Sequence, residues 1–158
     1  GSPLGAGQHA STIDFLIVQY INHKKLGIGS PLGTGQHASR IAFLMHWAQK
    51  TSQHLSREET NVSRSLKALS TTPATVFPRL YYGCIAHHLE DRGGKEKERR
   101  ILHNLKIRLD QEFLKLENYN PETDLPNKFT VRQQAQFFMG FAQCRAEFFT
   151  KSTQLEDN

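Results

Sequence analysis

The hydrophobic positions of this chain recur every three or four residues over several long stretches, which is the spacing of an amphipathic helix. The clearest stretch covers 95–117 and carries Leu102, Leu105, Leu109, Phe113 and Leu116. Similar periods predict helices at 39–55 and 131–151, and no stretch shows the alternation of a strand. The pattern therefore predicts an all-α protein, an up-and-down bundle of four or five helices.

A further helix is predicted at 72–89, between two strong local signals. Thr72 is a suitable N-cap and Pro73 suits the first helical turn, while two glycines at 93 and 94 end the segment. Pro78 lies inside this stretch, so the helix either kinks there or begins near Phe77. A loop at 118–128 separates the last two predicted helices.

The beginning of the chain contains an internal repeat. Residues 1–11 read GSPLGAGQHAS and residues 29–39 read GSPLGTGQHAS, and each copy leads into an apolar stretch. Two copies are too few for a repeat array, so we expect a tandem duplication. Because the chain begins with Gly1 and not with methionine, we also expect a processed product or a fragment. The expected organisation is a duplicated Gly/Pro-rich extension at 1–38, a helical bundle domain at 39–152 and a disordered tail at 153–158.

Composition narrows the functional classes. Twenty Lys and Arg against fifteen Asp and Glu give a net charge of +5, with a pI near 9.4, which favours an acidic partner such as nucleic acid. Cys84 and Cys144 are too few for a disulfide framework, which indicates the reducing cytoplasm. No apolar run approaches the roughly 20 residues that span a bilayer, so no membrane partner is expected.

Candidate catalytic motifs are weak. The glycine-rich loops lack the Lys-Ser/Thr and the preceding strand of a phosphate-binding loop, and no Gly-x-Ser-x-Gly motif occurs. Cys84 has metal-ligand spacing to His87 and His88, but no second pair completes a site, so a core thiol beside partly exposed imidazoles is the preferred interpretation. We therefore expect no enzyme, no cofactor and no metal.

Basic residues are concentrated on the predicted helix at 95–117. Arg99, His103 and Lys106 align along one flank of its apolar stripe. Such a flank can follow a phosphate backbone, because Lys and Arg displace condensed counterions without reading the sequence. The alternative is a solvated face with Glu–Lys pairs.

The predicted last helix is rich in phenylalanine, with Phe137, Phe138, Phe141, Phe148 and Phe149. Arg145 falls in the middle of their arc on the helical wheel. Because burying an unpaired arginine is costly, Arg145 should either pair with an internal acid, such as Glu117 or Asp110, or contact a partner.

Two blocks of sequence resemble a known family. The block TPATVFPRL at 72–80, followed by His87-His88-Leu89, resembles a stretch near the C-terminus of the large subunit of the type I-C CRISPR Cascade. The block FMGFAQCRAEFFTK at 138–151 resembles the final signature of the same family. The order and spacing of the blocks also agree, and the resemblance covers about residues 40–152.

In that family the C-terminal helical region is also made as a separate small subunit. The resemblance implies a non-catalytic component of an RNA-guided surveillance complex that stabilises the guide RNA–target DNA hybrid and the displaced DNA strand. The implied partners are guide RNA, target DNA, the backbone and large subunits of Cascade, and further copies of this chain. The nucleic-acid or subunit contacts expected on this interpretation are Arg64, Lys67, Arg79, Arg99, Arg100, Lys106, Arg145 and Lys151.

A different class of function is also open. A helical adaptor or inhibitor would dock on a partner protein through its Phe-rich last helix, with Phe148 and Phe149 exposed in the isolated chain. A metal-dependent hydrolase has almost no support in the sequence.

Overall fold

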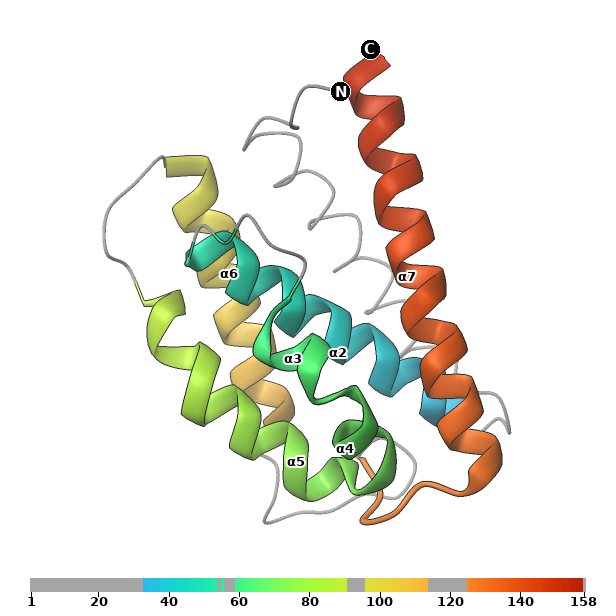
Figure 1. Cartoon of the computed structure of the whole chain (residues 1–158). Coiled ribbons are helices and arrows are strands. Elements are labelled where there is room, and N and C mark those ends of the chain that lie inside the picture. Colours follow the sequence, from blue (N-terminus) through green and yellow to red (C-terminus); the bar gives the residue numbers. More distant parts are fainter. Residues whose placement is uncertain (1–32, 54, 56–58, 91–95, 114–124, 158) are drawn as a thin grey trace.

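The computed structural model describes residues 33–53, 55, 59–90, 96–113 and 125–157, with side chains described at these positions except at 33, 97, 112 and 147–157. All regular structure in these ranges is helical, which confirms the predicted all-α bundle. The elements are α2 (Gly33–Ser52), α3 (Asn61–Arg64), α4 (Leu66–Thr71), α5 (Pro73–Leu80), η1 (Tyr81–Ile85), η2 (Ala86–Leu89), α6 (Glu96–Phe113) and α7 (Val131–Asp157). Figure 1 shows α2 crossing the centre of the molecule, α7 along one side and α5 on the other.

The helices α2 and α7 form the main contact of the fold, and they run in the same direction where they cross. Gly35 lies against the first turns of α7, and Ser39 lies against Gly140. One helical turn further along α2, the ring of Phe43 packs edge-on against Phe141, with centroids 5.5 Å apart. The small residues let the two backbones approach closely, and the aromatic rings fill the space where the helices diverge.

The beginning of α2 differs from the prediction. The helix starts at Gly33 instead of Ser39, so part of the second repeat copy is helical. Glycine is a poor helix former, and the sequence therefore favoured a loop. The close crossing with α7 requires a residue without a side chain at Gly35, and this tertiary contact outweighs the local preference.

The predicted helix at 72–89 is present, but its geometry changes along its length. It begins with Pro73 in the first turn, and Pro78 lies inside α5, followed by the wider turns of η1 and the tighter turns of η2. Pro78 removes one backbone donor from the helical ladder, which accounts for the irregular continuation. Thr72 stands at the N-cap position without a side-chain capping bond. Instead, the Ala74 N–H donates to the carbonyl of Pro126 at 3.1 Å.

The helix α6 closes the other side of the core. Its buried residues recur every four positions: Ile101, Leu105, Leu109 and Phe113. The ring of Phe113 packs against Phe77 and Tyr81, with centroids 6.3 Å and 5.0 Å away. The core is therefore continuous from α2 through α5 and η1 to α6.

Two further differences concern short and terminal elements. The helices α3 and α4 were not predicted, because elements of four and six residues do not contain a full hydrophobic period. The helix α7 continues to Asp157, past the predicted end at Lys151 and into the stretch expected as a disordered tail. No proline or glycine follows Gly140 to stop it. Within the described residues, no helix is long and apolar enough to cross a membrane.

Candidate nucleic-acid interface

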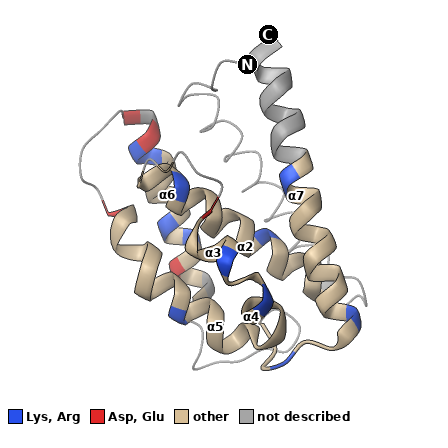
Figure 2. Ribbon diagram, in the orientation of Figure 1, with Lys and Arg blue, Asp and Glu red and all other residues tan. Residues whose placement is uncertain are grey.

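Four exposed cationic side chains gather where α3 and α4 meet the beginning of α7. They are Arg64, Lys67, Lys128 and Arg132, and we call this surface the basic end. Figure 2 shows Lys and Arg on α3, on α4, on the loop that leads into α7 and on the first turn of α7. The first two were predicted from the sequence, and the last two were not.

Backbone hydrogen bonds bring the two halves of the basic end together. The Phe129 N–H donates to the carbonyl of Thr71 at 3.2 Å, which fixes Lys128 beside the end of α4. Thr130 and Gln133 cap the beginning of α7 reciprocally: the Gln133 N–H donates to Thr130 Oγ1 at 3.1 Å, and the Thr130 N–H donates to Gln133 Oε1 at 2.9 Å. The turn that carries Arg132 is therefore held in place.

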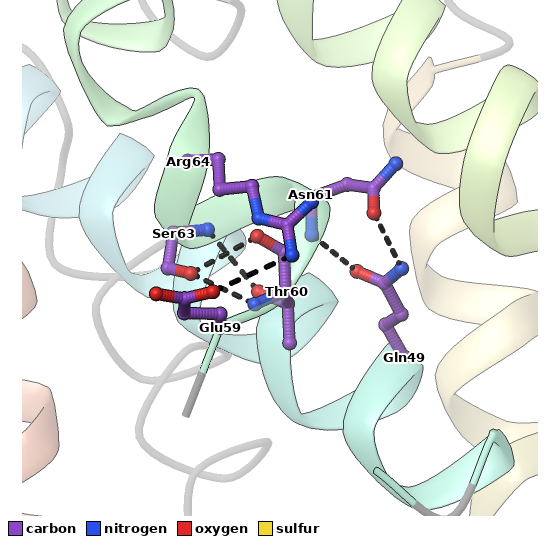
Figure 3. A network of polar contacts seen from close by, with 6 residues as sticks. All are labelled: Gln49, Glu59, Thr60, Asn61, Ser63 and Arg64. Carbon is purple, nitrogen blue, oxygen red and sulfur yellow. Dashed lines mark hydrogen bonds and ion pairs between the residues drawn. The ribbon is translucent and has the colours of Figure 1, made fainter. Parts of the chain in front are cut away.

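A polar network positions α3, and with it Arg64, against α2 (Figure 3). Thr60 and Ser63 form a capping box, in which the Ser63 N–H donates to Thr60 Oγ1 at 3.1 Å and the Thr60 N–H donates to Ser63 Oγ at 2.8 Å. Gln49 of α2 accepts from the Asn61 N–H at 3.0 Å and donates to the side chain of Asn61 at 3.1 Å. These bonds satisfy backbone donors at the start of α3 that the helix itself leaves unpaired.

The same network reaches the core through His46. Its Nδ1 lies 2.7 Å from Thr60 Oγ1, and both residues are buried. The imidazole also packs edge-on against Trp47 and Phe141, with centroids 5.5 Å and 6.1 Å away. One hydroxyl thus connects the aromatic core to the cap of the helix that carries Arg64.

Few carboxylates balance the basic end. Arg64 Nη2 lies 3.5 Å from Glu59 Oε2, and both side chains are about two-thirds exposed (65% and 66%). A solvated ion pair of this kind contributes little to stability, so Arg64 can exchange Glu59 for a phosphate at little cost. Lys67, Lys128 and Arg132 have no ion-pair partner among the described side chains. From Leu125 to Ala146 the sequence contains no Asp or Glu, and this feature could have identified the surface in advance.

The predicted flank of α6 is only partly available. Arg99, Arg100 and His103 are exposed, as a phosphate-binding flank requires. Lys106, in contrast, is bound to Asp110, with 2.8 Å between Nζ and Oδ2. The hydrogen bond to Asp110 raises the pKa of Lys106 above its ordinary value.

Asp110 also connects α6 to η1. Its Oδ1 accepts from the hydroxyl of Tyr81 at 2.6 Å. Burial, together with this hydrogen bond and the carboxylate charge, raises the pKa of Tyr81 well above its ordinary value. The Lys106–Asp110–Tyr81 group therefore fixes the packing of α6 against η1.

The remaining predicted contacts lie apart from the basic end. Arg79 is exposed on α5. Arg145 is exposed on α7, whereas its position on the helical wheel suggested that it lies among the rings. The face of α7 that is buried contains Phe137, Phe141 and Cys144, so the phenylalanines do not form one continuous buried arc. The side chains of Lys151, Phe148 and Phe149 lie outside the described part of the structure.

The Cys84, His87 and His88 group is formed by η1 and η2. The two imidazole rings are tilted by 42° to each other, with centroids 3.9 Å apart, and Cys84 is half-buried. In the part of the chain that the structure describes, no three or more His, Cys, Asp or Glu side chains are grouped to hold a metal ion.

Comparison with protein families supports the CRISPR-associated part of the resemblance noted in the sequence. The family model described as "CRISPR-associated protein (Cas_Csd1)" matches residues 40–149, more than half of the chain. No curated protein and no solved structure matches significantly. The matched residues include α3, α4, Lys128 in the loop before α7 and the Phe43–Phe141 contact between α2 and α7. The chain therefore belongs to the Cas_Csd1 family of CRISPR-associated proteins.

Proposed function

We propose that this chain is a non-catalytic small subunit of a type I-C Cascade in the cytoplasm, and that the basic end holds the sugar-phosphate backbones of the guide RNA–target DNA hybrid or of the displaced strand. Family membership supports a CRISPR-associated role, and the resemblance of the 72–80 and 138–151 blocks supports the assignment to type I-C. In this proposal base pairing reads the sequence, and the protein reads only charge and shape.

The observation that carries the proposal is the imbalance of charge at the basic end. Four cations are exposed, and among the side chains that the structure describes one carboxylate, that of Glu59, pairs with one of them. Each phosphate that such a surface neutralises releases condensed counterions, which makes binding favourable and independent of sequence. Hydrogen bonds of Phe129, Thr130 and Gln133 hold the backbone that carries Lys128 and Arg132, so binding does not have to order this segment.

Charge reversal tests the proposal directly. The variant K67E/K128E/R132E should bind a fluorescent oligo-dT strand less tightly than the unchanged protein. Its slope of log K against log salt should also be smaller in magnitude by about 2, because each phosphate contact with a single strand contributes about 0.7. The matched variant R99E/R100E reverses two exposed charges on α6 and reports whether that flank also participates.

The two variants distinguish three results. A loss in the triple variant alone identifies the basic end, and a loss in both variants extends the interface along α6. If the triple variant binds with unchanged affinity and unchanged salt slope, the basic end is not the interface. Absence of nucleic acid from the complex purified with the unchanged chain would refute the proposed function itself.

A further inference from the structure

Large hydrophobic side chains are exposed on the first half of α7. Of the five exposed in the described part of the structure, three lie here: Val131 (82% exposed), Met139 (70%) and Phe138 (44%). At 100° per residue they share one side of the helix with two exposed alanines, opposite the side that packs on α2. We call this surface the outer face: Val131, Ala135, Phe138, Met139 and Ala142.

The fold does not require these apolar residues. The core is complete on the opposite side of α7, through Phe137, Phe141 and Cys144. The other two exposed large hydrophobics, Tyr82 and Ile107, lie singly on other elements, as is common on protein surfaces. A stripe with helical spacing is different, because it offers a continuous apolar surface to a partner.

The outer face is bordered by positive charge. Lys128 and Arg132 lie at its beginning and Arg145 at its end, and all three are exposed. No acidic residue occurs between Leu125 and Ala146. A partner that covers this face gains most if its own apolar stripe is flanked by carboxylates.

We propose that the outer face binds an amphipathic helix of a partner protein whose apolar stripe is flanked by Asp and Glu. The apolar residues of α7 recur at the i, i+4, i+7 and i+11 positions that helix–helix packing uses. The close crossing at Gly140 packs α7 against α2, so a partner meets a helix that is already formed. This inference does not depend on the proposed nucleic-acid function.

Two other occupants fit the surface less well. A single nucleic-acid strand binds by stacking its bases on aromatic rings, but the outer face has one ring, Phe138, which packs edge-on against Phe137 with centroids 5.7 Å apart. A second copy of the chain would present the same basic border. It would therefore lack the flanking carboxylates that complement Lys128 and Arg132.

Binding of designed helical peptides to the full chain tests the proposal. The probes are a fluorescein-labelled peptide of about 18 residues with a leucine stripe flanked by Glu, and the same peptide flanked by Lys. The Glu peptide should bind, and Met139→Gln should weaken it by about tenfold or more, as expected for the loss of one buried apolar side chain. The matched control Ile107→Gln removes an exposed hydrophobic side chain from α6 and should leave binding unchanged.

Other outcomes would overturn the inference. Equal binding of the Lys peptide would show that flanking charge does not select the partner. Absence of binding by the Glu peptide would show that the outer face is not a docking site for such a helix. If instead Met139→Gln weakens only the binding of oligo-dT, the face contacts nucleic acid. If Met139→Gln abolishes a dimer seen by analytical ultracentrifugation, the occupant is a second copy.

Discussion

Replacing Gly140 by alanine tests whether close approach of α2 and α7 sets the stability of this fold. In an ordinary exposed helix this change stabilises by about 1 kcal/mol, because glycine is a poor helix former. Here a Cβ at position 140 would meet the side chain of Ser39, lying 3.0 Å from its Cβ and closer still to its Oγ. That Oγ already donates to the carbonyl of Gln36 at 2.6 Å, so it cannot move without losing a hydrogen bond.

The expected magnitude follows from these opposing contributions. Overpacking of a closely packed contact costs typically 1–3 kcal/mol, and a broken hydrogen bond adds about 1 kcal/mol. After subtraction of the helix-propensity gain, we expect Gly140→Ala to lower the free energy of unfolding by about 1–3 kcal/mol. For a chain of this size, the Tm should fall by roughly 3–9 °C.

Two other glycines provide matched comparisons in the same assay, urea and thermal unfolding followed by circular dichroism at 222 nm. At Gly35 a Cβ would lie 2.6 Å from the carbonyl oxygen of Gln133, so Gly35→Ala should destabilise more. At Gly83 a Cβ would meet nothing within 4 Å, so Gly83→Ala should be neutral or stabilise by about 0.4–1 kcal/mol.

A double-mutant cycle connects the effect to the crossing itself. Ser39→Gly removes the atoms that the new Cβ would meet, so the combination with Gly140→Ala should be more stable than the sum of the two single changes by about 1 kcal/mol. If Gly140→Ala is as stable as the unchanged chain, or the two changes add within about 0.5 kcal/mol, the argument from close packing is wrong.

Three further changes test other parts of the structure. Thr60→Val removes the cap of α3 and the polar partner of His46, so it should lower the free energy of unfolding by about 2–4 kcal/mol. Thr60→Ser keeps the hydroxyl and should retain most of the stability. Equal losses in the two variants would show that the hydroxyl is unimportant. Because the pKa of Tyr81 is raised in the folded chain, its contribution to the free energy of unfolding is complete below about pH 10, the ordinary pKa of tyrosine. This contribution is lost as the pH rises further, since the unfolded chain releases a proton that the folded chain keeps. Tyr81→Phe should flatten this alkaline fall in denaturant midpoints, and an equally steep fall in the variant would assign it to other groups. Phe141→Ala should cost about 3–5 kcal/mol, since the ring is 5% exposed and packs on Phe43; a loss below about 1 kcal/mol would contradict its place in the core.

The parts of the fold that could be predicted are those in which local pattern and tertiary role agree. The helix α6 and most of its buried side were visible in the sequence, because Leu105, Leu109 and Phe113 of the predicted stripe face the core. Ile101 is buried where the sequence favoured Leu102, which is only partly buried, and Leu116 lies outside the described residues. At Gly35 the local preference and the tertiary contact disagree, and the helix start was therefore placed six residues too late. The change of helix geometry after Pro78 was foreseen only as a kink or a later start.

The candidate site shows the same division. On α6, cations close in sequence were easy to recognise, but acids alternate with them, and Lys106 is bound to one of these acids in the folded chain. The basic end draws Arg64 and Lys67 from one part of the chain and Lys128 and Arg132 from another, about 60 residues away. Two backbone bonds join these segments, one from Phe129 to Thr71 and one from Ala74 to Pro126.

Absence of acids is therefore a better guide to a cluster of exposed cations than abundance of bases. The stretch from Leu125 to Ala146 contains no Asp or Glu, so it offers Lys128 and Arg132 no i,i+4 acidic partner of its own. Both cations are exposed in this structure, which is why the proposed partners are acidic. The two surfaces meet at the beginning of α7. Arg132, on the first turn of this helix, belongs to the basic end and also lies at the border of the outer face. The two surfaces can be separated by experiment, because Met139→Gln leaves the charge unchanged while Lys67→Glu leaves the apolar stripe unchanged.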